Sequence, residues 1–329
     1  MAVRALARVN LGAIERNTAR LASVAPDALL CAVVKADGYG HGMVAAAKAA
    51  LAGGARWLAV VSADEAAELR AAGIREQLLV LGPLSDEELP VALRADADIA
   101  IWREATVERI AALGGGRVHV KLDSGMGRFG TRDPLEAARV VAAVEAADGV
   151  TLAGLMTHFA TADDLGDTFL DEQLERFLAW AQPLRAGHPG VLVHAANSAA
   201  ILREPRSHLD MVRPGVGIYG LDPFGVDPAE QGLEPALELL SYVAEVKPCA
   251  AGESAGYGRR FIASQPTTIA TIPIGYGDGW RRGLTNNAEV LVDGRRFPVV
   301  GTVSMDSITV DLGPQSNIAT GAEVVLIGA

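Results

Sequence analysis

The chain has few of the features that mark a secreted, membrane or nucleic-acid-binding protein. Only two of its 329 residues are cysteine, Cys31 and Cys249, and neither lies in metal-type spacing, so no disulfide framework or metal site is expected. Lysine and arginine total 29 against 40 acidic residues, and the net charge of −11 argues against nucleic acid and anionic membranes as partners. Long apolar runs and a signal-peptide core are also lacking, so we expect a cytoplasmic protein.

What is present is a large hydrophobic share, 50% of the residues, which is typical of a well-packed enzyme acting on small molecules. After a first helix expected at 12–24, short apolar runs alternate up to about residue 220 with segments whose apolar residues recur at three- and four-residue spacing. The expected strands are 29–35, 57–62, 77–82, 98–102, 118–123, 152–158, 191–197 and 215–219. Eight strand–helix pairs in this length predict a (β/α)8 barrel of the TIM type.

After residue 226 the pattern changes to β-branched runs separated by Gly, Pro, Asn and Asp. Asp293-Gly294 lies between two of these runs and predicts a tight hairpin. The C-terminal part is therefore expected to be a mostly β domain, joined to the barrel by the Pro- and Gly-rich segment 221–235. Its expected strands are 241–247, 267–274, 288–292, 297–303, 307–312 and 322–327.

Lys35 ends the first apolar run and is followed by the glycine-rich sequence ADGYGHG. A lysine at the end of a buried strand is a candidate for Schiff-base chemistry. The glycines would let backbone N–H groups approach an anion before a helix begins near Met43. The same segment could also be a plain strand end with a solvated lysine, so other residues must decide.

Polar side chains at the ends of four further strands favour a functional site, because barrel active sites gather at that rim. Each also has a structural alternative: a local salt bridge, a core histidine, a helix cap or a surface ion pair. Their common placement favours one site, and a lysine, an arginine and an anion-binding backbone point to a phosphorylated carbonyl ligand such as pyridoxal phosphate. The residues are Lys121 with Asp123, His158, Asn197 with Ser198, and Arg213.

Eight sequence blocks carry a resemblance to the alanine racemases, which are fold-type III pyridoxal phosphate enzymes. In chain order they are AVVKADGYGHG, VKLDSGMGRFG, THFATAD, HAANSAA, VRPGVGIYG, AGYG, TIPIGYGDGW and VGTVSMD. The resemblance implies a barrel followed by a β domain, in a head-to-tail homodimer whose active sites use both chains. Residues 1–10 would form a strand that joins the β domain, 11–225 the barrel and 226–329 the β domain. The activity implied is interconversion of L- and D-alanine, which supplies D-alanine for cell-wall peptidoglycan.

The same resemblance implies roles for individual residues. Lys35 would bind pyridoxal phosphate and act as one base, and Tyr257 of the other chain would be the second base on the opposite face of the substrate. The phosphate would be held by Tyr39, Ser198 and the backbone of Gly215 and Val216, with Asn197 helping to fix the site and His158 packing beside the pyridine ring.

Arg213 would donate to the pyridine nitrogen. Because a guanidinium stays protonated, that nitrogen must accept and remain largely unprotonated, which weakens the ring as an electron sink and suits proton exchange without transamination. His158 and Arg213 would also be the cations that favour the phenolate of Tyr257.

On the substrate side, the resemblance implies that Arg128 and the backbone N–H of Met305 from the partner chain bind the carboxylate. Lys121 would correspond to a lysine that can be carbamylated to position that arginine. Tyr276 and Asp306 would form the gate at the entrance.

The family normally continues past the LIG segment, so the β domain is either truncated relative to it, with weaker cofactor retention and a less stable dimer expected, or completed in a different way. Four alternatives stay open: a racemase of serine or broader specificity, a related decarboxylase, a non-catalytic pyridoxal phosphate-binding barrel, and a cofactor-free barrel in which Lys35 forms a Schiff base with its substrate. The paired base Tyr257 disfavours the decarboxylase and the non-catalytic barrel.

Overall fold

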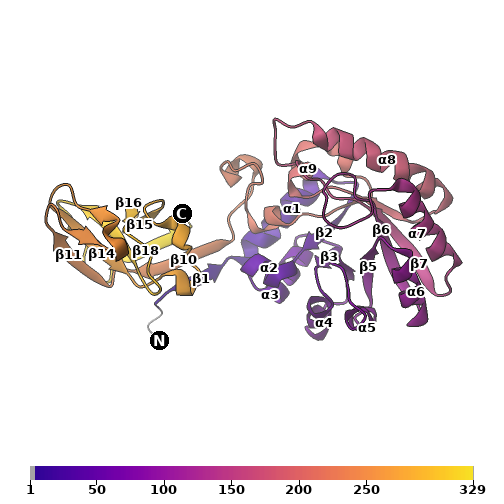
Figure 1. Cartoon of the computed structure of the whole chain (residues 1–329), viewed down its shortest axis with the longest axis horizontal. Helices are drawn as coiled ribbons and strands as arrows, with labels where there is room; N and C mark the ends of the chain where they lie inside the picture. The colour runs from indigo at the N-terminus through magenta and orange to yellow at the C-terminus, as the bar shows by residue number, and fades with distance from the viewer. Residues whose placement is uncertain (1–3, 329) are drawn as a thin grey trace. The chain divides into compact units, whose positions relative to one another are not determined.

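The computed structural model describes residues 4–328, which divide into two compact units (Figure 1). One unit is Leu11–Ala236, and the other combines the segment ending at Asn10 with the segment that begins at Leu237. Across the described residues, no helix combines the length and the apolar character needed to cross a membrane.

The first unit is a closed barrel of eight parallel strands, as the alternation of apolar runs and helices predicted. Closure comes from the parallel pairing of the first and last strands, in which Leu29 lies opposite Met211. The strands are β2 (Leu29–Val33), β3 (Trp57–Val60), β4 (Gln77–Val80), β5 (Ala97–Ile101), β6 (Gly116–Lys121), β7 (Val150–Met156), β8 (Leu192–His194) and β9 (Met211–Val212).

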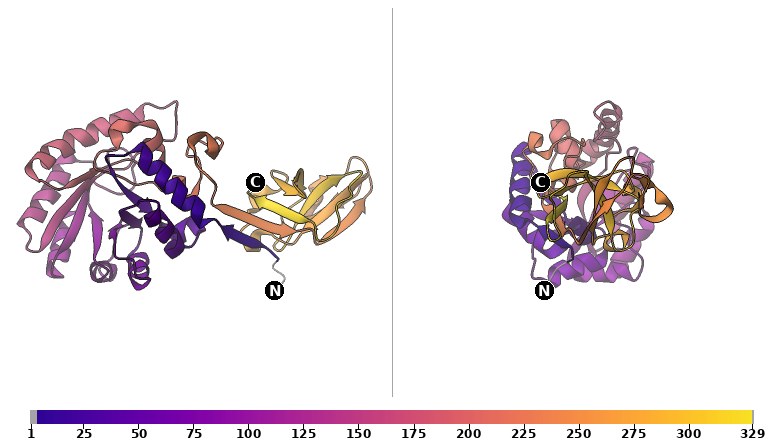
Figure 2. Two further views of the ribbon diagram at one scale, coloured as in Figure 1. Left: turned by 180° about the vertical axis from the view of Figure 1, so that it is seen from behind. Right: turned by 90° about the vertical axis from the view of Figure 1, so that its left-hand side faces the viewer.

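Helices surround this barrel, and Figure 2 shows them around the strands from two further directions. Sequence signals fix several of their starts: Ser62 and Glu65 form a capping box at α4, and Asp133 caps α7 with Pro134 at its first position. The helices are α1 (Leu11–Val24), α2 (Lys35–Gly40), α3 (Met43–Ala52), α4 (Ala63–Ala71), α5 (Glu88–Arg94), α6 (Glu104–Ala112), α7 (Pro134–Ala146), α8 (Phe169–Gly187) and α9 (Ser198–Arg203).

The eighth strand lies earlier in the chain than expected, so the prediction of a strand at 215–219 is wrong. Those residues form the 3₁₀ turn η2 (Val216–Tyr219), and the strand is β9. Pro214 has no N–H with which to continue the ladder, and the N–H groups of Gly215 and Gly217 donate to Ser198 Oγ at 3.0 and 3.1 Å. Arg213 therefore directly follows the strand.

The second unit is an antiparallel sheet of eight strands in the order β1-β10-β18-β15-β16-β17-β14-β11, beside a two-stranded hairpin of β12 and β13. Its core includes Trp280 and Phe297. Asp293 and Gly294, at φ 49° and 71°, make the predicted hairpin turn between β15 and β16. The strands are β1 (Leu6–Val9), β10 (Leu237–Tyr242), β11 (Glu245–Cys249), β12 (Ser254–Ala255), β13 (Phe261–Ile262), β14 (Thr267–Ile272), β15 (Glu289–Val292), β16 (Arg295–Val300), β17 (Ile308–Gly313) and β18 (Glu323–Ile327).

The single strand expected at 241–247 is two strands. The Val243 N–H bonds the carbonyl of Ala322, next to β18, whereas the Ala244 N–H bonds the carbonyl of Thr271 in β14. The chain changes partners between these two residues, and Val243 is fully buried there. A continuous apolar run does not reveal such an exchange.

Candidate functional site

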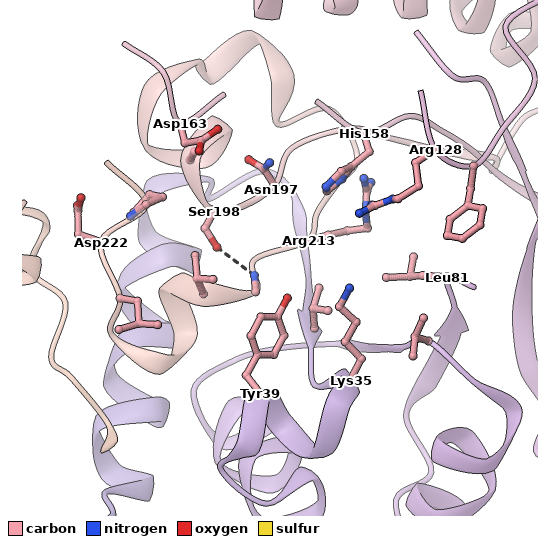
Figure 3. A pocket seen from close by; sticks show the side chains of 18 of the residues that line it. Lys35, Tyr39, Leu81, Arg128, His158, Asp163, Asn197, Ser198, Arg213 and Asp222 are labelled. Atoms are coloured by element: carbon pink, nitrogen blue, oxygen red, sulfur yellow. Dashed lines mark hydrogen bonds between the residues drawn. The ribbon is translucent and has the colours of Figure 1, made fainter. Parts of the chain in front are cut away.

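A cavity of ≈ 570 Å³ lies at the carboxyl ends of the barrel strands. Its lining includes every barrel residue that the sequence analysis placed in a cofactor or substrate site, and Figure 3 shows several of these side chains pointing toward one another. They are Lys35, Tyr39, Lys121, Arg128, His158, Asn197, Ser198, Arg213, Gly215 and Val216.

Lys35 enters this cavity because the chain turns abruptly after β2. Residues 36–39 all adopt left-handed backbone angles, with φ between 51° and 62°, and Gly38 is the only glycine among them. Left-handed geometry costs roughly 1–2 kcal/mol for each non-glycine residue, so the turn depends on contacts around it. Met43 N–H donates to Asp37 Oδ1 at 2.8 Å, and Ala36 N–H donates to Glu65 Oε1 at 2.6 Å. The same turn brings Tyr39 to the cavity.

The two lysines of the cavity have lowered pKa values. Burial, followed by the charge of Arg128, lowers the pKa of Lys35. Burial together with the charges of Arg213 and Arg128 lowers the pKa of Lys121 to about 8. Both amines are therefore more readily deprotonated than a surface lysine, as a nucleophile or a modifiable amine requires.

Tyr39, Ser198 and Gly215 form one end of the cavity. The Ser198 hydroxyl accepts two backbone N–H groups but has no acceptor for its own proton among the described residues. A Cβ on Gly215 would lie 2.5 Å from the Tyr39 hydroxyl, so only glycine leaves this space open. Burial raises the pKa of Tyr39, which keeps its O–H as a donor. Asn197 caps α9 by accepting the Ala200 N–H at 3.0 Å.

Arg213 is almost fully buried at the floor of the cavity. Its guanidinium donates to the carbonyls of Thr157 and Ala195 at 2.6 and 3.0 Å and to His194 Nδ1 at 2.5 Å. Burial lowers the pKa of Arg213 to about 10, which leaves it a cation at neutral pH. Its Nε–H and one Nη1 hydrogen have no partner among the described residues.

A hydrogen-bond chain runs from Arg213 through the barrel interior. His194 Nε2 lies 2.7 Å from His119 Nδ1, and His119 Nε2 lies 3.1 Å from Asp98 Oδ2. Because Arg213 can only donate, His194 accepts at Nδ1 and carries its proton on Nε2, and His119 likewise accepts at Nδ1 and donates from Nε2. Arg117 Nε closes the chain on Asp98 Oδ1 at 2.6 Å. We call the residues Arg213, His194, His119 and Asp98 the interior relay.

His158 is positioned by Gln173, a fully buried residue of α8. The Gln173 amide donates to the His158 carbonyl at 3.2 Å and accepts the Ala160 N–H at 2.8 Å. Burial, together with the charges of Arg213 and Lys121, holds the pKa of His158 well below 6.5. The expectation that His158 supplies positive charge to a phenolate is therefore wrong, because its imidazole is neutral.

Arg128 lies on a loop that Asp123 holds closed. The Asp123 carboxylate accepts the N–H groups of Gly125 at 3.0 Å and Gly127 at 2.9 Å. Asp123 does not line the cavity, so it serves the loop and not the ligand. The Phe129 ring centroid lies 5.9 Å from both Lys121 Nζ and Arg128 Cζ, a cation–π arrangement.

The remaining predicted site residues belong to the β unit. Tyr257, on the turn η4 (Tyr257–Arg259), is 71% exposed, and its carbonyl accepts the Thr302 hydroxyl at 2.6 Å. Tyr276 and Met305 are also exposed, and the Tyr276 N–H donates to the Ser304 carbonyl at 3.0 Å. Asp306 lies 3.7 Å from Arg4.

Sequence reasoning missed the interior relay, Gln173 and Glu65. A signal for the relay was present, because Asp98, His119 and His194 interrupt otherwise apolar barrel strands. Nothing comparable marked Gln173 or Glu65, since both lie on amphipathic helices where a polar residue is ordinary.

Comparison with known proteins places both units in one family. The family model for the alanine racemase N-terminal domain matches residues 9–223, and that for the C-terminal domain matches 236–329. Alanine racemases of Desulforamulus reducens and Thermobifida fusca are 40% and 41% identical, in alignments over 98% of this chain and 89% and 88% of theirs. Among solved structures, the enzyme of Streptomyces lavendulae superposes with a TM-score of 0.94 at 34% identity, over 100% of this chain and 88% of that one. The biosynthetic enzyme of Pseudomonas aeruginosa gives 0.92 at 37%, over 99% and 90%.

Proposed function

The chain belongs to the alanine racemase family, and from this membership we propose that its barrel cavity holds pyridoxal 5′-phosphate for the interconversion of L-alanine and D-alanine. The main support for the proposal is that Lys35 and Arg213 line the same cavity as the end formed by Tyr39, Ser198 and Gly215. The product D-alanine would serve cell-wall peptidoglycan, and the protein would be a cytoplasmic isomerase.

The donors of the cavity fit this cofactor. The Ser198 hydroxyl proton and the Val216 N–H have no acceptor among the described residues, and the space that a Cβ on Gly215 would fill lies beside the Tyr39 hydroxyl. This end suits a phosphate. The free N–H groups of Arg213 suit an acceptor nitrogen, and His158 lines the same cavity as a neutral ring. Asn197 contributes by fixing the start of α9.

Lys35 would hold the cofactor until the substrate amine takes its place and frees the lysine, and the cofactor would then supply the electron withdrawal that makes the substrate α-proton acidic. The lowered pKa of the Lys35 amine suits it to take or return that proton on one face. Tyr257 of a second copy would exchange it on the opposite face, which gives inversion. Arg213 would keep the cofactor ring nitrogen an acceptor, because the guanidinium retains its proton.

Arg128 would bind the substrate carboxylate, with the backbone N–H of Met305 from the second copy as a further donor. The Lys121 amine, with its pKa of about 8, is suited to carbamylation, and the resulting anion would hold Arg128 in place. Tyr276 and Asp306 would form the gate. These roles require a homodimer, which we propose on the exposure of Tyr257 and Met305.

The experiment is proton exchange in D₂O with chiral analysis of the products. Wild-type protein loaded with pyridoxal 5′-phosphate should convert L-alanine to deuterated D-alanine, and Lys35→Ala should abolish this. Tyr257→Phe should slow both directions. Exchange with L-serine as fast as with L-alanine would favour the alternative of broader specificity. If no amino acid exchanged, the racemase proposal would be refuted.

A further inference from the structure

Glu65 connects the segment that carries Lys35 to the neighbouring helix. It lies in the first turn of α4, and its Oε2 accepts the N–H groups of Val61 at 2.7 Å and Ser62 at 3.3 Å. Its Oε1 accepts the N–H of Ala36, the residue after Lys35, at 2.6 Å. One oxygen therefore caps its own helix, and the other holds the start of the left-handed turn.

A second capping box in the barrel shows which of these contacts is unusual. At the next strand–helix unit, Glu88 accepts the Ser85 N–H at 2.8 Å, and the Glu88 N–H donates to Ser85 Oγ at 3.3 Å. The Glu65 N–H makes the same 3.3 Å bond to Ser62 Oγ. Both glutamates cap a helix, but the hydrogen bond of the Glu88 carboxylate stays within its own unit.

The Ala36 N–H needs an acceptor from outside the turn. Ala36 has φ 51° and ψ 53°, and the hydrogen bonds of the turn run from Gly38 N–H to the Val34 carbonyl and from His41 N–H to the Gly38 carbonyl. Neither involves Ala36 N–H, so the carboxylate oxygen of Glu65 is its acceptor. A charged acceptor is the strongest available for a single N–H group.

We propose that Glu65 is a positioning residue for Lys35, which it orients by holding the Ala36 N–H at the start of the left-handed turn. The inference rests on the proposed role of Lys35 as the cofactor lysine. The carboxylate also acts through space, because its charge opposes the lowering of the Lys35 pKa by burial and by Arg128.

The test uses full-length chains carrying Glu65→Gln or, as the matched control, Glu88→Gln. Each variant loses one capping carboxylate, but only Glu65→Gln alters the contact to Ala36. The chain has only four lysines, Lys35, Lys48, Lys121 and Lys247, so ¹³C-reductive methylation gives few signals and the Lys35 titration can be followed by NMR in cofactor-free protein. Retention of pyridoxal 5′-phosphate is measured in parallel by visible absorbance.

We expect Glu65→Gln to lower the Lys35 titration midpoint and to weaken cofactor retention by on the order of tenfold, the effect of losing one charge-assisted hydrogen bond. Glu88→Gln should lower the melting temperature about as much as Glu65→Gln does. It should change neither the Lys35 titration midpoint nor the retention of the cofactor. Equal Lys35 readouts in the two variants would overturn the inference. Glu65→Asp is measured alongside, because it keeps the charge but is too short to reach Ala36, and it takes the place of Glu65→Gln if that variant fails to fold.

Failure of the proposed function would look different. Wild-type protein would then bind no pyridoxal 5′-phosphate at Lys35, whereas the NMR titration of the cofactor-free chains would still report whether Glu65 controls this amine. A titration difference that Glu65→Asp also shows, although it keeps the charge, would support the positioning role, and a difference confined to Glu65→Gln would refute it.

Discussion

The interior relay predicts a specific pattern of stability losses in the barrel. His194→Leu removes the acceptor of Arg213 and the donor to His119 in a single substitution, and all three side chains are buried. Asp98→Asn acts at the other end, where one amide must face two donors, His119 Nε2–H and Arg117 Nε–H. Both changes leave buried polar groups without partners.

The magnitudes follow from counting those groups. His194→Leu leaves a charged donor and an imidazole acceptor unpaired, at about 1–3 kcal/mol each, so we expect a loss of about 2–6 kcal/mol. Asp98→Asn leaves one donor unpaired and removes a charge, for about 2–3 kcal/mol. Because the relay is one continuous chain, the double variant should lose less than the sum by at least ~1 kcal/mol.

Urea unfolding followed by tryptophan fluorescence measures these losses. Trp57, Trp102 and Trp180 lie in the barrel unit, and the Trp57 ring lies 5.7 Å from His119, edge to face. The fluorescence change therefore reports mainly on the barrel. The control is His208→Leu, which removes a bond from a partly buried imidazole to the Ile201 carbonyl outside the relay. If the double variant loses as much unfolding free energy as Asp98→Asn and His194→Leu lose together, the interior relay does not act as one unit.

Three further outcomes follow from the cavity. Gly215→Ala should weaken pyridoxal 5′-phosphate binding at least tenfold, because the new Cβ would lie 2.5 Å from the Tyr39 hydroxyl; equilibrium dialysis at unchanged melting temperature checks this. Because the pKa of Lys121 in the folded protein is about 8, the fraction of neutral amine rises as the pH passes that value. In ¹³C-bicarbonate, the NMR signal of a lysine carbamate should therefore grow from pH 7 to pH 9. The Lys121→Ala variant should lack this signal. The Arg203 guanidinium donates to the backbone carbonyls of Asp164 and Asp167. Arg203→Ala should therefore speed amide hydrogen exchange in residues 159–168, and unchanged exchange would contradict a role of Arg203 in holding this loop.

The sequence was sufficient to predict the barrel because its strands are continuous apolar runs between amphipathic helices. It misplaced the last strand, since VGIY is as apolar as a true strand and only the hydrogen bonds of Ser198 make it a turn. The cavity residues could be predicted from motifs at strand ends. The neutral state of His158 could not, because its lowered pKa depends on the burial of the imidazole and on how closely Arg213 and Lys121 approach in space.

The left-handed turn after Lys35 also bears on how the protein reaches its native state. An isolated chain seldom adopts four successive left-handed residues, so this segment cannot act as an early nucleus of folding. Its acceptor, Glu65, and the Tyr219 ring that packs 5.0 Å from Tyr39 come from α4 and from the last segment of the barrel. Lys35 is therefore set in place only when the ring of strands has closed, and a partly folded chain would lack the arrangement that we propose holds the cofactor.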